Sequence, residues 1–207
     1  MKIIAIMDKT SYALGMSIAH NLMQSGVNKL EIKDFTAGLE AVLNGQEPAV
    51  SFKEAGQLLE DYFSNMEAEK AAEEAEVAEA MKKEGEEFLK ENAGKPGVIT
   101  LKSGLQYKVL KEGTGRKPGK TSKVRCHYEG TFTNGMTFDS SYKRGEPAVF
   151  GVNQVIAGWT EALQLMSEGS EWELYIPYQL AYGEAGAHGA IPPCAALVFK
   201  VELIEVL

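Results

Sequence analysis

The residues that could do chemistry are one carboxylate and a group of aromatic rings in the second half of the chain. The segment Val155-Ile156-Ala157-Gly158-Trp159 is central to this group, and Asp139 is its acidic member. A tryptophan at the start of a short helix, among strands, can form the flat floor of an apolar pocket. Such a pocket, with few polar groups, favours binding and conformational work over bond cleavage. The other rings of the group are Tyr128, Phe138, Phe150, Tyr182 and Phe199.

The position of this tryptophan depends on a helix whose signal is clear. From Trp159 onward, apolar residues recur at i, i+3, i+4 and i+7, ending at Met166. This spacing is the apolar stripe of an amphipathic helix. Gly158 before it and Gly169 after it are typical of helix ends, so they bracket the predicted helix.

The sequence contains no pattern for a metal, a cofactor or a disulfide framework. The two cysteines, Cys126 and Cys194, have no C-x-x-C neighbour, and no Cys/His pair has the spacing of metal ligands. We therefore expect neither a cofactor nor a metal. A single structural disulfide between the two cysteines is the less favoured alternative.

Charge and hydropathy exclude several function classes. The net charge of −8 argues against a nucleic-acid partner, because phosphate binding requires clustered Lys and Arg. No segment is predicted to span a membrane. The apolar run Met1–Met7 is shorter than the core of a signal peptide and lacks a small-residue cleavage site. We therefore expect a cytoplasmic protein, with export to the periplasm or cell surface as the weaker alternative.

The first 93 residues are predicted to be helical. A first amphipathic helix ends near Gly26, and a second runs from about Asp34 to Asn44-Gly45. The third begins at Ser51-Phe52-Lys53-Glu54, which has the pattern of a capping box. Residues 67–91 continue it with ten Glu and four Lys but little apolar face, so we expect an exposed connecting helix. A disordered charged linker is the alternative.

The helices before residue 66 carry more apolar surface than so short a segment can bury alone. A second copy of the chain commonly completes such a segment, so we predict a homodimer through the N-terminal helices. The alternative is a helical hairpin that caps the rest of the same chain.

The composition changes at Asn92–Gly97, and the apolar period then becomes two. Asn134-Gly135 is typical of a tight hairpin turn. Short strands, one short helix and Gly- and Pro-rich loops predict an α+β domain with an antiparallel sheet wrapped around the helix. The expected domains are 1–66, helical dimerisation; 67–93, a long polar connecting helix; and 94–207, the sheet domain.

Several motifs together resemble the FKBP-type peptidyl-prolyl cis-trans isomerases from Val124 to Leu207. The motifs are Tyr128-Glu129-Gly130, Phe138-Asp139-Ser140-Ser141, Val155-Ile156-Ala157-Gly158-Trp159, Ala181-Tyr182-Gly183, Ile191-Pro192-Pro193 and Leu197-Val198-Phe199. The helical leader, with Lys95-Pro96-Gly97 and the segment 103–108, is similar to the bacterial subgroup typified by the macrophage infectivity potentiator. That subgroup implies dimers joined through intertwined helical leaders.

The resemblance also implies a site and roles for its residues. The catalytic set would be Asp139, Tyr182, Trp159 and Phe138. The substrate-binding set would be Tyr128, Phe150, Val155, Ile156, Ile191 and Phe199. A proline ring would lie on Trp159, while the Ile156 backbone N–H and the Tyr182 hydroxyl would donate to carbonyls of the ligand. Asp139 would act on the twisting amide or orient Tyr128.

Other interpretations of these residues stay open. Phe150, Val155 and Phe199 could belong to an ordinary core, and Asp139 could cap the Ser140-Ser141 turn or pair with Arg144. Two positions depart from the family pattern, because Ala148 replaces a common aromatic and Ala190 a larger aliphatic residue. These departures put the affinity for macrolides such as rapamycin in question.

The sequence therefore predicts a peptidyl-prolyl isomerase that assists the folding of proline-containing chains. The rival hypothesis is a dimeric chaperone or peptide-binding module with little isomerase activity. Asp139, Trp159 and Tyr182 favour the enzyme.

Overall fold

The computed structural model describes residues 7–27, 29–187 and 189–207. Most of the apolar run from Met1 to Met7, on which the expected location depends, lies outside these residues. The chain divides into two units, Met1–Ala71 and Ala72–Leu207, which are described separately below.

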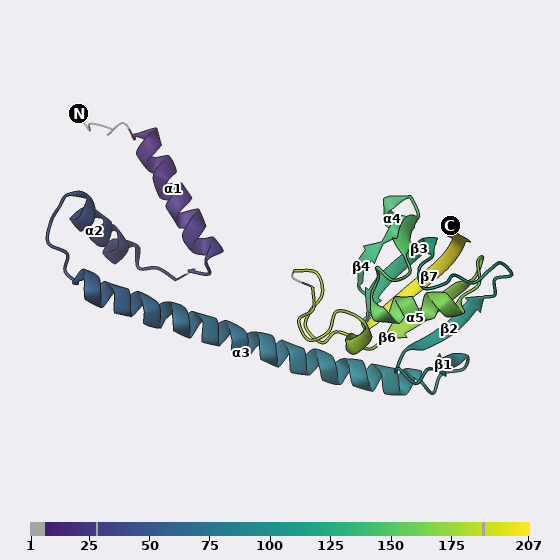
Figure 1. Ribbon diagram of the computed structural model, residues 1–207. Coiled ribbons are helices and arrows are strands. Elements are labelled where there is room, and N and C mark those ends of the chain that lie inside the picture. The colour runs from purple at the N-terminus through teal and green to yellow at the C-terminus, as the bar shows by residue number, and fades with distance from the viewer. Residues whose placement is uncertain (1–6, 28, 188) are drawn as a thin grey trace, which may run out of the picture. The chain divides into compact units, whose positions relative to one another are not determined.

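The first unit is helical, as predicted (Figure 1). It contains α1 (Lys9–Gln24), α2 (Ile32–Leu43) and the first part of α3 (Phe52–Asn92). Asp8 caps α1, because its Oδ2 accepts a 2.9 Å hydrogen bond from the Ser11 backbone N–H. Ser51 Oγ accepts one of 3.2 Å from the Glu54 N–H, which places the start of α3 where the capping pattern predicts it.

Helices α1 and α2 contain no buried residue within the chain itself. Large apolar side chains face solvent on both, including Leu14, which is 60% exposed, and Leu43, which is 79% exposed. Helices of this kind gain most of their stability by packing an apolar face against another element. The single chain leaves that face largely uncovered.

The second unit contains a seven-stranded sheet with the order β1-β2-β6-β7-β3-β4, and β5 pairs with β3. Every pairing is antiparallel, as the sequence predicts. The hairpin between β3 and β4 turns at Asn134-Gly135, where Gly135 has φ +84°. The strands are β1 (Val98–Thr100), β2 (Gln106–Lys111), β3 (Lys123–Phe132), β4 (Thr137–Ser140), β5 (Ala148–Gly151), β6 (Glu171–Ile176) and β7 (Leu197–Val206).

Helix α5 (Ala157–Leu165) is the helix around which the sheet curls, and its Ala162 and Leu163 are fully buried in the core (Figure 1). Gly158 lies in its first turn, whereas the sequence places this glycine before the helix. A Cβ at Gly158 would lie 2.6 Å from Ile176 Cγ2, so the glycine allows α5 to approach β6 closely. The unit has two further short helices, α4 (Ser141–Arg144) and η1 (Tyr178–Leu180).

Residues 67–80 of α3 are almost all exposed, as the composition predicts, whereas the last part of the helix packs against the sheet unit. Gly85 is buried, and a Cβ there would lie 2.8 Å from Ala196 Cβ. Asn92 Nδ2 donates a 3.0 Å hydrogen bond to Gln106 Oε1, and Gln106 Nε2 donates one of 2.8 Å to the Leu89 carbonyl. These contacts hold the end of α3 on β2.

Candidate active site

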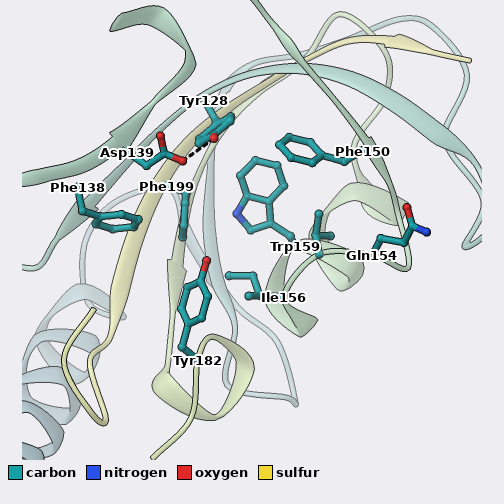
Figure 2. A pocket seen from close by; sticks show the side chains of 10 residues that line it. Tyr128, Phe138, Asp139, Phe150, Gln154, Ile156, Trp159, Tyr182 and Phe199 are labelled. Atoms are coloured by element: carbon teal, nitrogen blue, oxygen red, sulfur yellow. Dashed lines mark hydrogen bonds between the residues drawn. The ribbon is translucent and has the colours of Figure 1, made fainter. Parts of the chain in front are cut away.

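A cavity of about 470 Å³ opens over α5 in the second unit (Figure 2). Its lining is mostly aromatic and aliphatic, with one carboxylate at the edge. The lining residues are Tyr128, Phe138, Asp139, Phe150, Gln154, Val155, Ile156, Trp159, Tyr182 and Phe199.

Trp159 forms the floor of this cavity and is 4% exposed. Three rings meet it edge to face, with centroid distances of 5.4 Å to Tyr128, 5.6 Å to Phe150 and 5.4 Å to Phe199. This is a preferred geometry for aromatic pairs and fixes each ring against its neighbours. The cavity is therefore a preformed, largely apolar site, and its volume lies within the range of roughly 300–1,000 Å³ that is typical of small-molecule sites.

Strand alternation and one glycine position these rings. Tyr128 follows Val124 and Cys126 on the buried face of β3, and Phe199 lies on β7 beside it. A Cβ at Gly130 would lie 2.6 Å from Phe138 Cζ and 2.7 Å from Phe199 Cε1. Gly130 thus leaves the space in which those two rings pack, 5.6 Å apart, at one side of the cavity.

Asp139 is held by two partners at the rim. The Tyr128 hydroxyl donates a 2.5 Å hydrogen bond to Asp139 Oδ2, and Arg144 pairs with Asp139 Oδ1. Arg144 Nη2 also donates a 2.7 Å hydrogen bond to the Tyr128 hydroxyl, and its guanidinium lies 5.4 Å from the centre of that ring. Both carboxylate oxygens are therefore engaged, and Arg144 pairs with Asp139 as one of the sequence interpretations proposed.

The electrostatics of the rim follow from these contacts. Burial acts to raise the pKa of Asp139, but the hydrogen bonds from Tyr128 and Arg144, with the charge of Arg144, outweigh it and lower the pKa. Burial, reinforced by the hydrogen bond to Asp139, raises the pKa of Tyr128. The site therefore holds an ionised carboxylate and a protonated phenol at neutral pH.

Tyr182 and Ile156, which both line the cavity, each carry a hydrogen-bond donor. Figure 2 shows the Tyr182 hydroxyl pointing into it, and this side chain is 41% exposed. Burial and the nearby charge of Asp139 raise the pKa of Tyr182, which keeps its proton in place. Ile156 is the residue immediately before α5, and within the described residues no hydrogen bond uses its backbone N–H. N–H groups at a helix start have no partner inside the helix.

The structure brings together nine of the ten residues that the sequence proposed for the site. Ile191 is the exception, because it is 6% exposed in the core and lines a neighbouring cavity instead. Gln154 lines the site and was missed, since a lone amide before an apolar segment has no distinguishing pattern. Ala148 packs against the core and Ala190 lines the neighbouring cavity, so neither residue lines the candidate active site.

The described residues hold neither a metal-ligand cluster nor a disulfide. Within them, no group of three His, Cys, Asp or Glu side chains could hold a metal ion. Cys126 and Cys194 are both buried free thiols. None of the helices in the described part of the chain is long and apolar enough to cross a membrane.

Two known protein families together match almost the whole chain. Residues 114–204 match the family FKBP-type peptidyl-prolyl cis-trans isomerase, and residues 7–109 match the domain amino terminal to FKBP-type peptidyl-prolyl isomerase. The FKBP-type 22 kDa peptidyl-prolyl cis-trans isomerase of Escherichia coli strain K12 is 44% identical, over 96% of this chain and 95% of that protein. The crystal structure of FkpA from Escherichia coli has a TM-score of 0.74 at 35% identity, covering 96% of this chain and 95% of the other.

The name of another relative conflicts with the cytoplasmic location that the sequence predicts. The outer membrane protein MIP of Legionella longbeachae is 41% identical, over 96% of this chain and 85% of that protein. The expectation of a cytoplasmic protein is therefore wrong. It depended on a short apolar run whose first six residues lie outside the described structure.

Proposed function

The chain belongs to the FKBP-type peptidyl-prolyl cis-trans isomerases, and we propose that the cavity over Trp159 is where it rotates Xaa-Pro bonds. The observation that carries this proposal is the aromatic cavity with a single, fully engaged carboxylate at its rim. It has the apolar lining of a prolyl site, and none of the described residues that line it is arranged as a nucleophile. The substrates are proline-containing polypeptides.

The chemistry requires only differential solvation and hydrogen bonding. Amide resonance gives the peptide bond a rotation barrier of about 18–20 kcal/mol. The planar amide is more dipolar than the twisted one, so transfer from water into an apolar cavity disfavours the ground state. A thousandfold rate gain needs about 4 kcal/mol of such differential stabilisation.

We assign roles to the lining residues on this basis. The proline ring lies on Trp159, between the walls formed by Tyr128, Phe150 and Phe199. Phe138 closes one side, and Val155 packs near the start of α5. The Ile156 N–H and the Tyr182 hydroxyl donate to carbonyls of the substrate. The two hydrogen-bond partners of Asp139 support a positioning role for it, through Tyr128, over direct action on the twisting carbonyl.

We propose that the chain forms a homodimer through its N-terminal helices. We also propose three domains: residues 1–66 for assembly, 67–93 for connection and 94–207 for catalysis. The exposed apolar side chains of α1 and α2 support this division. The paired helical segments would also bind unfolded clients, which adds a chaperone role to the isomerase. A module that binds peptides without turnover is not favoured, because the site retains Asp139 and Tyr182 beside Trp159.

The test is cis-to-trans isomerisation of a short Xaa-Pro tetrapeptide by the full chain, with rapamycin as competitor. We expect turnover that rapamycin inhibits, because the macrolide would occupy the same cavity. A folded chain without turnover would support the binding module instead. Turnover that rapamycin leaves unchanged would restrict the proposal to the prolyl substrate and remove the macrolide from it.

A further inference from the structure

A second apolar surface lies beside the proposed active site, between α3 and the β3–β4 hairpin. Two cavities, of about 470 Å³ and about 210 Å³, share three of their lining residues. We name this surface the helix–hairpin groove. It is formed by Val77, Met81, Phe132, Met136, Ala190 and Pro192.

The groove borders the proposed active site, because a ring that lines one packs against a ring that lines the other. The Phe132 ring, which lines both cavities of the groove, lies 5.1 Å from Phe138, which lines the active site. Figure 2 shows Phe138 at the edge of the active-site cavity, on the side away from Phe150 and Gln154. A polypeptide that leaves the active site past Phe138 therefore meets Phe132 next.

The spacing of the rings indicates how much of the polypeptide this path would use. From Trp159 it runs through Phe199 and Phe138 to Phe132, in ring-to-ring steps of 5.4, 5.6 and 5.1 Å. An extended chain covers this path with about five residues, at roughly 3.3 Å per residue. This path bends at each ring, so it is an upper limit on the direct distance between its ends, and a side chain adds to the reach of the backbone. A side chain three to five residues from the proline thus reaches the groove.

The groove is open and apolar in this chain. Met136 is 60% exposed and Val77 is 45% exposed, although both are large apolar side chains. Ala190 lines the larger cavity with only a methyl group, where a longer aliphatic side chain would occupy part of the space. This small residue therefore leaves room for a side chain from a partner.

The charge at the groove points to the same kind of partner. Glu74 and Glu84 of α3 line it, and Glu84 accepts a hydrogen bond from Thr133 on the hairpin. No basic side chain lines either cavity within the described residues. The acidic lining therefore disfavours a segment that carries Asp or Glu beside its apolar side chain.

We propose that the helix–hairpin groove binds a second segment of the polypeptide whose prolyl bond occupies the active site. This segment presents a large apolar side chain three to five residues from the proline. The inference rests on the proposed function, and it adds a second recognised position to the polypeptide that carries the Xaa-Pro bond. If so, changes in the groove alter the affinity for long polypeptides but leave the turnover of short peptides unchanged.

The test uses fluorescein-labelled peptides of eleven residues with one central proline and binding by anisotropy to the full chain. Paired peptides differ only in carrying Leu or Ser four residues before, or four residues after, the proline. The variants are Met136→Ser, which removes apolar surface, and Ala190→Leu, which fills the groove. Leu110→Ser is the control, because Leu110 is 44% exposed and lies outside the groove.

We expect the wild-type chain to bind the Leu peptide of one of the two pairs about fivefold more tightly than the matching Ser peptide, because one leucine is partly buried. Met136→Ser and Ala190→Leu should bring this ratio close to one, while Leu110→Ser keeps it. Turnover of a proline tetrapeptide, too short to reach the groove, should stay unchanged in all three variants.

Three results would overturn the proposal. The first is a ratio of one for both peptide pairs with the wild-type chain. The second is equal weakening of Leu and Ser peptides by Met136→Ser, which would indicate damage to the active site. The third is a change of sedimentation coefficient in Met136→Ser, because the groove would then be covered by a second copy. Failure of the wild-type chain on the tetrapeptide would instead reject the proposed function, while the binding ratio would still report on the groove.

Discussion

The Tyr128 hydroxyl on β3 donates a 2.5 Å hydrogen bond to Asp139 Oδ2 on β4, which joins two adjacent strands at the rim of the cavity. Arg144 binds both members of the pair, so the phenol is held between a carboxylate and a guanidinium. The wall of the site formed by Tyr128 therefore depends on a carboxylate that is not itself part of the apolar surface.

Asp139→Asn should lower kcat/KM for a proline tetrapeptide by about 10- to 100-fold, because a charged hydrogen bond contributes about 1.5–3 kcal/mol. Tyr128→Phe removes the hydrogen bond to residue 139 itself, whereas Asp139→Asn removes its charge and keeps an acceptor oxygen. If Asp139 acts by positioning Tyr128, the double variant should be hardly worse than Asp139→Asn alone. A double-mutant cycle on kcat/KM measures this coupling.

The control for this cycle is Arg125→Gln, which removes another ion pair of the same sheet, to Glu205, away from the cavity. Its turnover should equal that of the wild-type chain. Strictly additive losses for Asp139→Asn and Tyr128→Phe would instead assign Asp139 a direct role in the reaction.

Turnover should be independent of pH from about 5 to 9. The pKa of Asp139 is lowered from its ordinary value of 3.8, and those of Tyr128 and Tyr182 are raised from 10.0. Because the folded pKa of Asp139 is depressed, its contribution to stability is present above pH 3.8 and is lost as the pH falls through the folded value. Acid denaturation followed by circular dichroism should be shallower for Asp139→Asn below about pH 4. A titration of kcat/KM near pH 6 to 7 would contradict this account.

The sequence predicts most of the ring set of the site, because Tyr128, Phe138, Trp159, Tyr182 and Phe199 each belong to a motif that carries the family resemblance, whereas Phe150 belongs to none of them. It also predicts the antiparallel sheet, since the period of two and the Asn134-Gly135 turn are local signals. The partners of Asp139 were left as alternatives. Whether Arg144 reaches the carboxylate depends on α4, a helix of four residues with no periodic signal.

The contacts of α3 show a second limit. Its polar composition predicts an exposed helix, yet Gly85 and Asn92 are buried against the sheet unit. Gly85, which has no side chain, and the buried amide of Asn92 allow this packing. Neither residue changes the apolar periodicity of the 41-residue helix. Ile191 illustrates the same limit, because its motif matches while its side chain points into the core. Tertiary packing decides such positions, and a single sequence does not display it.

Tyr182→Ala should reduce kcat/KM by at least about tenfold, because it removes both a wall and a hydrogen-bond donor of the site. Tyr142→Ala is the matched control. The two tyrosines are 41% and 42% exposed, but Tyr142 lies on α4, stacked on His127 at 4.5 Å, and not in the cavity. Equal losses in the two variants would mean that the effect comes from exposed aromatic surface in general.

Gly158→Ala should destabilise the sheet unit by about 1–3 kcal/mol, because the new Cβ would lie 2.6 Å from Ile176 Cγ2. The variant should also displace Trp159, the next residue of α5, from its place in the core. The near-UV circular dichroism spectrum should therefore change together with the midpoint of denaturant unfolding. Gly119→Ala is the control, since its new Cβ would have nothing nearer than Ser122 Oγ at 3.8 Å. Unchanged stability in Gly158→Ala would show that β6 and α5 can separate without loss.

The full chain, with a mass of 22.5 kDa, should behave as a dimer in light scattering at micromolar concentration. The apolar side chains of α1 and α2 are exposed in the single chain, and a second copy would remove them from water. Leu14→Lys places a charge on that surface and should weaken dimerisation by at least about tenfold, because an unpaired buried charge is strongly disfavoured. Val149→Lys, at a side chain 51% exposed on β5, should leave the mass unchanged. A monomeric wild-type chain would reject the dimer, and the apolar face of α1 would then be left for binding unfolded clients.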